Sequence, residues 1–506
     1  MIIKALQHEV VGPLVLGLAL LMAYSNIYSN QYLLDDEFLL EKNRYIKDLD
    51  YFDRIFTSSS TMGAGGTDSF YRPMQTLAYF VTYQIFGMSK AAFHALNLFF
   101  HFLNALLIYL LARRRLSLSM GFAVLPALLW GLHPLHTEAV TYMSATADPL
   151  HTLFVLLAVF FLERRGLAAF FFFLGLLSKE SAIVFPALAC VWIGVKSSAP
   201  FRLSTYRPTW PFWLMALAYL IARKTFLNFD DTFSFYKEAN IYTENIHYRL
   251  FTFLATLPDY LGLLFWPHDL HMERNFPVFA SFWLWPPMVG FLLLLLGFIF
   301  SWRERGRDFR PVSLMFFWFM AAHVPHTGVL LPVNSLFLEH WMYLPSVGLV
   351  LGAGSLLARK ISYRWVWAVA IPCALALGYK TYTQNAVWQD PITFYEHILS
   401  LDRGNSRVQN NLAMAYGESG QTERAIEHYL KAIEFEDRYP QVRHNLAEEY
   451  MKLGNLEQAL IHLHRAIEIN PRFYHSYKDL AAVYQRLGDQ KKAMEYYNQY
   501  QKLRPE

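Results

Sequence analysis

Three adjacent carboxylates, Asp35, Asp36 and Glu37, follow the first apolar run of the chain. Mutual repulsion between crowded carboxylates raises the pKa of at least one of them. A carboxylate with a raised pKa suits a general base, and the same cluster suits a metal or another cation. The alternative is an acidic helix start in which an aspartate caps the first turn. The sequence leaves these interpretations of Asp35 and Asp36 open.

Basic side chains that could bind a phosphate occur in three further motifs: Tyr71-Arg72-Pro73, Lys179-Glu180 and Glu339-His340. A cation near a membrane surface can hold a lipid phosphate, and arginine can do so with two parallel hydrogen bonds. Simpler interpretations also exist. Arg72 can be an interfacial anchor, and Lys179 can pair with Glu180. Trp341 and Tyr343 can be aromatic residues of the membrane interface.

Two histidines and a glutamate lie in the motif HPLHTE at the end of another apolar run, as His133, His136 and Glu138. These residue types bind metals, but Pro134 breaks the regular helical face that metal ligands at this spacing would need. A polar cluster lining a cavity is therefore the favoured interpretation, since ionisable groups at membrane depth are usually functional. Asp148 follows on the same predicted side of the membrane.

Long apolar runs must position these residues. The chain of 506 residues is 55% hydrophobic and only 17% charged, whereas soluble domains have about 25% charged residues. The mean hydropathy is +0.21. A helix needs about 20 apolar residues to cross a bilayer. The candidate segments are 10–28, 93–112, 119–138, 148–163, 166–178, 181–196, 209–224, 248–266, 282–302, 311–331, 340–358 and 364–384.

Lysine and arginine clusters between the runs orient them, because cytoplasmic loops carry an excess of these residues. The clusters predicted to be cytoplasmic are Arg113 to Arg115, Arg164-Arg165, Lys196 with Arg202 and Arg207, Arg303 with Arg305, Arg307 and Arg310, and Arg359-Lys360 with Arg364. The loop 29–92 and the part after residue 385 then lie outside the cytoplasm. The cluster at Lys196 to Arg207 and the cluster at Arg303 to Arg310 must lie on the same side of the membrane. The candidate spans 209–224, 248–266 and 282–302 lie between them, and an odd number of crossings cannot return the chain to the same side. Segment 248–266, which carries charged residues and a proline, is therefore predicted to lie at the interface, leaving about 11 spans.

A 34-residue repeat fills the C-terminal part of the chain. Leu-Ala recurs at residues 412, 446 and 480, and glycine recurs at residues 420, 454 and 488. This period, with small residues at helix crossings and a turn glycine, is typical of tetratricopeptide repeats (TPRs). Three repeats are predicted in residues 401–506, joined by a linker, 386–400, to a membrane domain, 1–385. Such arrays usually bind a peptide or protein, and the alternative is a spacer or dimer surface.

These motifs together resemble the transmembrane and TPR-containing O-mannosyltransferases of the GT-C glycosyltransferase superfamily, or their prokaryotic relatives. The resemblance covers nearly the whole chain. It is carried by Asp35-Asp36, Tyr71-Arg72-Pro73, the sequence HPLHTEAV at 133–140, Lys179-Glu180 and EHWMYLPS at 339–346. One departure is Glu339-His340, where the family tends to have Glu-Arg.

The resemblance implies an all-α, multi-pass membrane enzyme that moves a sugar, mannose, from a polyprenyl-phosphate carrier to an extracytoplasmic hydroxyl in one inverting step. The expected acceptor is a serine or threonine of a protein that the repeats present. Asp35 or Asp36 would be the general base, and Arg72, Lys179 and His340 would bind the donor phosphate. The residues expected to line the sugar site are Tyr71, His133, His136, Glu138, Asp148, Glu180, Glu339 and Tyr343.

The sequence also bears on cofactors, on nucleic-acid binding, on location and on alternative functions. No cofactor is certain, and a divalent cation is a candidate. The net charge of +4 is too small to indicate nucleic acid. The expected location is the cell membrane of a prokaryote, or the endoplasmic reticulum of a eukaryote. The alternatives are a GT-C transferase that acts on a lipid or glycan, and a non-enzymatic membrane-anchored TPR scaffold or a transporter.

Overall fold

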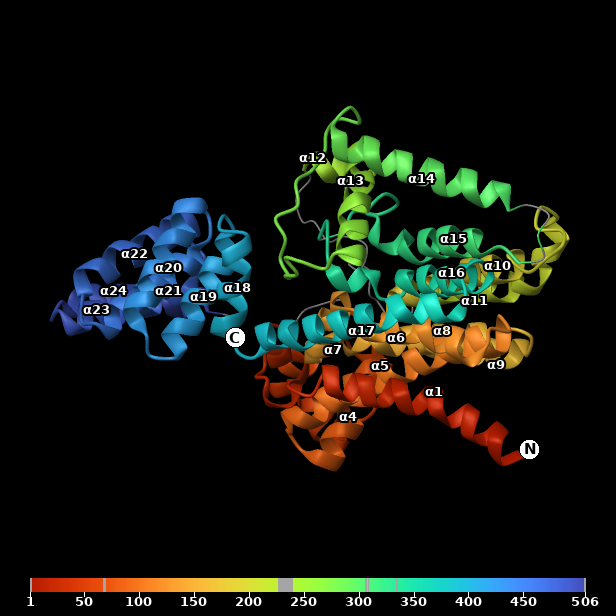
Figure 1. Cartoon of the computed structure of the whole chain (residues 1–506). Helices are drawn as coiled ribbons and strands as arrows, with labels where there is room; N and C mark the ends of the chain where they lie inside the picture. Colours follow the sequence, from red (N-terminus) through yellow and green to blue (C-terminus); the bar gives the residue numbers. More distant parts are fainter. Residues whose placement is uncertain are drawn as a thin grey trace. The chain divides into compact units, whose positions relative to one another are not determined.

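The computed structural model describes residues 2–66, 70–225, 240–304, 307, 309–333 and 335–504, with side chains from residue 10 onward. Arg305, one of the arginines predicted to be cytoplasmic, lies outside these ranges. Every regular element within them is helical, as predicted. The chain forms two compact units (Figure 1). The first contains residues 1–272 and 276–389, and the second contains residues 273–275 and 390–506.

One long helix of the first unit overlaps each of the twelve apolar segments. These helices are α1 (Ile2–Ala23), α5 (Lys90–Leu110), α6 (Met120–Gly131), α8 (Ala147–Phe160), α9 (Arg165–Leu176), α10 (Phe185–Gly194), α11 (Trp210–Thr225), α13 (Ile246–Phe265), α14 (Trp285–Arg303), α15 (Pro311–His323), α16 (Pro345–Lys360) and α17 (Tyr363–Asn385). The loop after α1 adds α2 (Arg44–Lys47), α3 (Arg54–Thr57) and α4 (Pro73–Phe86), and α7 (Thr137–Thr141) and α12 (Ile241–Glu244) are short.

Among the described residues, three helical segments are long and apolar enough to cross a membrane: Lys90–Arg115, Met143–Phe160 and Trp285–Arg303. Four shorter helices are also apolar: Val10–Ala23, Met120–Gly131, Arg165–Leu176 and Glu180–Gly194. The number of about 11 spans and their orientation stay predictions.

The long apolar helices differ in how deeply they lie in the unit. The segment Met143–Phe160 is 83% buried, and its helix α8 packs against α5 and α9. The segment Trp285–Arg303 is only 17% buried, so α14 presents an apolar surface that lipid would cover. Helices α1 and α17 come from opposite ends of this unit's sequence and lie side by side (Figure 1).

Helix α13 is the segment that the charge pattern placed at the interface, and it forms one continuous helix packed against α14. The two helices approach closely at Gly290, where an added Cβ would overlap the backbone carbonyl of Leu254. Glycine at a helix crossing lets two backbones come together in this way.

Gly290→Ala is therefore expected to lower the free energy of unfolding by about 1–3 kcal/mol, since the backbone of Leu254 must move. Gly262→Ala on α13 is the matched control, because a Cβ there meets open space. Alanine favours a helix over glycine by up to about 1 kcal/mol, so this variant should be at least as stable as the parent protein. Melting temperatures of the two purified variants in one detergent test this expectation. Equal losses in both would contradict the close crossing.

The second unit contains the predicted repeats as three helix pairs. Its helices are α18 (Pro391–Leu401), α19 (Ser406–Glu418), α20 (Thr422–Phe435), α21 (Pro440–Lys452), α22 (Leu456–Ile469), α23 (Tyr474–Arg486) and α24 (Gln490–Leu503). Gly420, Gly454 and Gly488 adopt φ of 78°, 74° and 82° where the first helix of each pair ends, a conformation that glycine favours. Residues 386–400, predicted as a linker, hold a 3₁₀ turn and most of α18, which packs against α19.

Candidate active site

In the acidic motif after α1, the side chains of Asp35 and Asp36 lie in different environments. Leu34 adopts a left-handed conformation with φ of 50°, which a residue with a Cβ rarely holds unless its surroundings enforce it. Asp36 supplies that restraint. Its carboxylate accepts hydrogen bonds from the N–H of Leu33 at 2.9 Å, the N–H of Ser144 at 2.8 Å and the hydroxyl of Ser144. Asp36 is buried and Asp35 is exposed. The capping alternative is wrong for Asp36, since its side chain makes no bond to the following helical turn.

Burial, and to a smaller extent the charge of Asp35, raise the pKa of Asp36 to about 7 against the lowering effect of the hydrogen bonds. A carboxyl group with a raised pKa holds its proton more tightly in the folded state than in the unfolded state. Its contribution to stability is therefore highest below the unfolded pKa near 4. That contribution is lost as the pH rises from about 4 to 7.

The difference in unfolding free energy between the parent protein and Asp36→Asn should consequently fall by on the order of 4 kcal/mol from pH 4 to pH 7. Asparagine cannot ionise, so the other titrating groups cancel in the difference. Denaturation of both proteins across this pH range in one detergent gives the curve. A difference independent of pH would show that Asp36 titrates normally.

Lys179 and Glu180 do not pair with each other, in contrast to the simpler interpretation. The Nζ of Lys179 lies 2.6 Å from Oδ1 of Asp148. Glu180 instead accepts from two arginines: its Oε2 lies 3.1 Å from Nη2 of Arg72, and its Oε1 lies 3.3 Å from Nη2 of Arg223. These three ion pairs form a charged cluster between helices.

Helix ends bring this cluster together. Asp148 is in the first turn of α8, where the helix dipole favours a negative charge. Arg72 immediately precedes Pro73, the first residue of α4, and Arg223 is in the last turn of α11. Lys179 and Glu180 connect α9 to the 3₁₀ turn Glu180–Val184. Four sequence-distant segments therefore place charges at one location.

Next to this cluster, His340 pairs with Glu138. Glu138 accepts from the backbone N–H of His340 at 2.9 Å, and its Oε1 lies 2.8 Å from the ring Nδ1. The Glu138 side chain is 2% exposed and that of His340 is 15% exposed. Asp148 interacts electrostatically with both Lys179 and His340. The predicted phosphate ligands Lys179 and His340 are thus near each other.

The histidines of the HPLHTE motif have separate partners. The Nε2 of His133 lies 2.9 Å from the carbonyl oxygen of Leu264. The ring of His136 packs among Trp130 and Tyr343. Glu138 contacts His340 instead of either histidine, so the motif does not converge on one metal position.

The remaining predicted residues are mostly structural supports of the site. The hydroxyl of Tyr343 lies 2.7 Å from Nδ1 of His101, and Tyr343 is buried, so the interface-anchor interpretation is wrong for it. Glu339 accepts from the N–H of His271 at 2.8 Å. Tyr71 donates to the carbonyl oxygen of Phe56 at 2.9 Å and interacts electrostatically with Arg223.

Comparisons with known proteins agree with the arrangement of both units. The tetratricopeptide repeat family matches residues 406–438, 440–473 and 474–506. The chain is 23% identical over 441 residues to Protein O-mannosyl-transferase F38B6.6 of Caenorhabditis elegans, with 83% of this chain and 62% of the relative covered. It is 22% identical over 426 residues to Protein O-mannosyl-transferase TMTC3 of Homo sapiens, with 72% and 44% covered. The chain is similar to TMTC protein O-mannosyl-transferases over most of its length.

The chain spans between 44% and 62% of the length of those two curated relatives. Protein O-mannosyl-transferase TMTC4 of Homo sapiens is 22% identical over 492 residues, with 83% of this chain and 65% of the relative covered. These relatives are animal proteins, and the prokaryotic origin expected from the sequence stays a prediction.

Two residues of the charged cluster were missed in the sequence analysis. Arg223 is 1% exposed and belongs to the Glu180 pair, and His326 interacts electrostatically with Lys179. A signal for Arg223 existed. Arg223 and Lys224 end an apolar run on the side predicted to be non-cytoplasmic, where basic residues are disfavoured. A basic residue that opposes the orientation rule indicates an internal partner.

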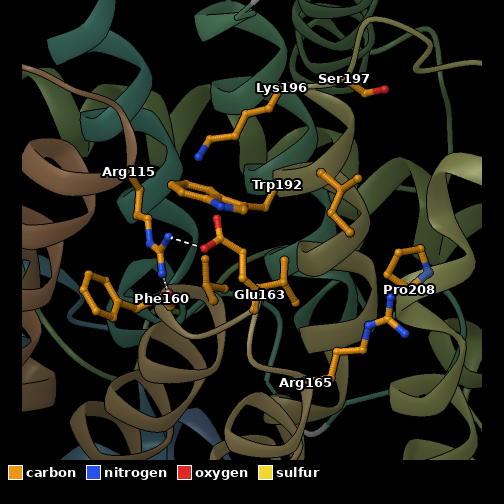
Figure 2. A pocket seen from close by; sticks show the side chains of 11 residues that line it. Arg115, Phe160, Glu163, Arg165, Trp192, Lys196, Ser197 and Pro208 are labelled. Atoms are coloured by element: carbon orange, nitrogen blue, oxygen red, sulfur yellow. Dashed lines mark hydrogen bonds and ion pairs between the residues drawn. The ribbon is translucent and has the colours of Figure 1, made fainter.

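A cavity of about 450 Å³ lies at the other end of α8 and α10 (Figure 2). Arg115, Arg165 and Lys196 line it, one from each of three clusters that the sequence placed on one side. Glu163 lies 2.8 Å from Arg115. Phe160 at this cavity and Asp148 in the charged cluster are twelve residues apart on α8, or about 18 Å along the helix. The cation-rich cavity and the charged cluster are therefore separate sites.

Proposed function

We propose that the chain transfers mannose from a polyprenyl-phosphate carrier to a serine or threonine hydroxyl of an extracytoplasmic protein, with inversion at the anomeric carbon. The observation that carries the proposal is the meeting of Arg72, Lys179 and His340 at helix ends, each fixed by a carboxylate. The names of the related protein O-mannosyl-transferases support the sugar and the class of acceptor.

The donor phosphate would be bound by cations that are already held in place. The Arg72 and His340 side chains are 17% and 15% exposed, whereas those of Asp148, Glu138 and Arg223 are at most 8% exposed. Glu138 holds His340 directly. The buried Arg223 holds Glu180, which is 25% exposed and in turn holds Arg72. A preorganised cation stabilises the charge that develops on the leaving phosphate without reorganising at the moment of reaction.

Asp35 would be the general base. Its side chain is exposed, whereas the carboxylate of Asp36 is enclosed by Leu33 and Ser144. The acceptor oxygen forms a bond to the anomeric carbon while the bond from that carbon to the phosphate oxygen breaks. The electron pair leaves with the polyprenyl phosphate, and the hydroxyl proton passes to Asp35. Asp36 is then a positioning residue that holds the turn at Leu34.

The acidic motif and the cation cluster are neighbours in the first unit. Tyr79 of α4 interacts electrostatically with both Asp36 and Arg72. Its hydroxyl donates at 2.9 Å to the carbonyl oxygen of Met143, the residue before Ser144. A base and a phosphate site must lie within the length of one sugar for a single displacement, and this neighbourhood supports that requirement.

Radiolabelled mannosyl phosphoryl polyprenol, supplied to the purified protein in detergent, tests the proposal. Separate reactions contain a serine- and threonine-rich peptide, a membrane-lipid extract or no acceptor, each with and without a metal chelator. Label on the peptide hydroxyl is the expected result. Label only on lipid would replace the protein acceptor by a lipid or glycan acceptor. The absence of transfer to any acceptor would favour a non-enzymatic scaffold. Transfer that occurs without the chelator and is lost in its presence would show that the reaction needs a divalent cation.

The repeats are proposed to bind the polypeptide acceptor. Tetratricopeptide arrays present extended concave surfaces that recognise peptides. A chain lacking residues 402–504 would then transfer mannose to short peptides normally and lose activity on folded proteins. The membrane unit of this variant must first show an unchanged melting temperature.

A further inference from the structure

The second unit carries two histidine–carboxylate pairs on consecutive repeats. His444 and Glu448 are four residues apart on α21, and His475 and Asp479 are four residues apart on α23. Residues at this spacing lie on the same face of a helix, one turn apart. Helices α21 and α23 are the first helices of the second and third repeats, and they contact each other directly.

Three of these side chains converge. One ligand atom each from His444, Glu448 and Asp479 lies within 4.8 Å of the others. A ring nitrogen of His444 is 3.7 Å from Oε1 of Glu448, and the other is 3.5 Å from Oδ2 of Asp479. The rings of His444 and His475 have centroids 6.0 Å apart. Ligands around a tetrahedral ion at 2.0–2.2 Å lie about 3.4 Å from one another. Because Glu448 and Asp479 face different nitrogens of the His444 ring, one of them must rotate for all three to reach this spacing around one ion.

One buried carboxylate oxygen of the group receives no hydrogen bond. Oδ2 of Asp479 is buried without a hydrogen-bond partner, 3.5 Å from a ring nitrogen of His444. The side chains of His444 and Asp479 are only 10% and 17% exposed. A buried carboxylate oxygen without a partner is costly, and a bound cation would remove that cost.

We propose that His444, Glu448 and Asp479 bind one divalent transition-metal ion of the zinc class, with His475 as the fourth ligand. Imidazole nitrogen combined with carboxylate oxygen suits zinc better than magnesium or calcium, which prefer oxygen alone. The Glu448 side chain is 52% exposed, so it can rotate until its carboxylate lies beside that of Asp479, near the same nitrogen of the His444 ring. The ion would tie the second repeat to the third. This inference is independent of the proposed transferase activity.

Metal binding by the full-length protein, purified in detergent without a polyhistidine tag and stripped with a chelator, tests the site. Zinc is titrated in competition with a chromophoric chelator, and the melting of the second unit is followed with and without zinc. One tightly bound zinc per chain and a higher melting temperature with zinc are expected. Asp479→Asn and Glu448→Gln, which preserve shape, should each weaken binding at least about tenfold.

The matched control is the pair His464 and Glu468 on α22, which has the same spacing. This pair lies outside the three-residue group that converges. His464→Gln with Glu468→Gln should bind zinc as the parent protein does. Absence of stoichiometric binding in the parent protein would overturn the proposal. Equal weakening in the control would also overturn it, because it would indicate general binding by surface histidines.

Discussion

Replacing Asp35 with asparagine is expected to lower the rate of sugar transfer by roughly 10²–10⁴-fold, the contribution typical of a positioned general base. Asparagine keeps the size of the side chain and removes its ability to take a proton. The affinity for the donor should stay unchanged, since the phosphate ligands lie on other segments. Single-turnover rates at saturating donor, measured beside donor binding, separate the two effects.

Two neighbouring variants serve as controls for this result. Glu37→Gln removes the adjacent carboxylate, which pairs with Lys42, and should leave the transfer rate close to that of the parent protein. Asp36→Asn loses the bond from the Leu33 N–H and should act mainly through stability. If Asp36→Asn abolished transfer in a folded protein while Asp35→Asn remained active, the base would be Asp36.

Asp148→Asn is expected to destabilise the first unit by about 3–5 kcal/mol, because it leaves a lysine charge buried without its partner. The side chains of Lys179 and Asp148 are only 10% and 8% exposed. Removing both charges together, in Asp148→Asn with Lys179→Met, should recover a large part of this loss. Chemical denaturation of the two single variants and the double variant gives the interaction energy directly.

The exposed ion pair at the opposite end of α8 is the matched comparison. Glu163 pairs with Arg115, but its side chain is 77% exposed. Glu163→Gln should therefore cost no more than about 1 kcal/mol. Equal costs for Asp148→Asn and Glu163→Gln would show that the Lys179 pair is effectively hydrated.

The helices and repeats could be predicted from the sequence to a greater degree than the contacts between their side chains. Apolar runs of about 20 residues and a 34-residue period follow from the requirements of helices and repeats, and both were recognised from residue types alone. Segment 386–400 was interpreted as a linker between the membrane domain and the repeats, yet most of it forms α18, which packs against α19. Such a helix depends on the neighbour that covers it.

The separate ion-pair partners of Lys179 and Glu180 could not be predicted from the fact that the two residues are adjacent. Lys179 has extended backbone angles, φ of −158° and ψ of 142°. Successive side chains of an extended chain point in opposite directions. Lys179 therefore reaches Asp148, and Glu180 reaches the arginines. In the same way, the left-handed turn at Leu34 determines which aspartate is buried, and no spacing rule anticipates that turn.

The sharing of Glu180 between Arg72 and Arg223 has a consequence for how this protein can diverge. A neutral residue at position 180 would leave two guanidinium groups without their common carboxylate, so a single substitution there removes two partners at once. Positions 72, 180 and 223 should therefore change together, or not at all, across homologous sequences. Positions 115 and 163, whose pair is exposed to solvent, are under no such constraint and should drift independently.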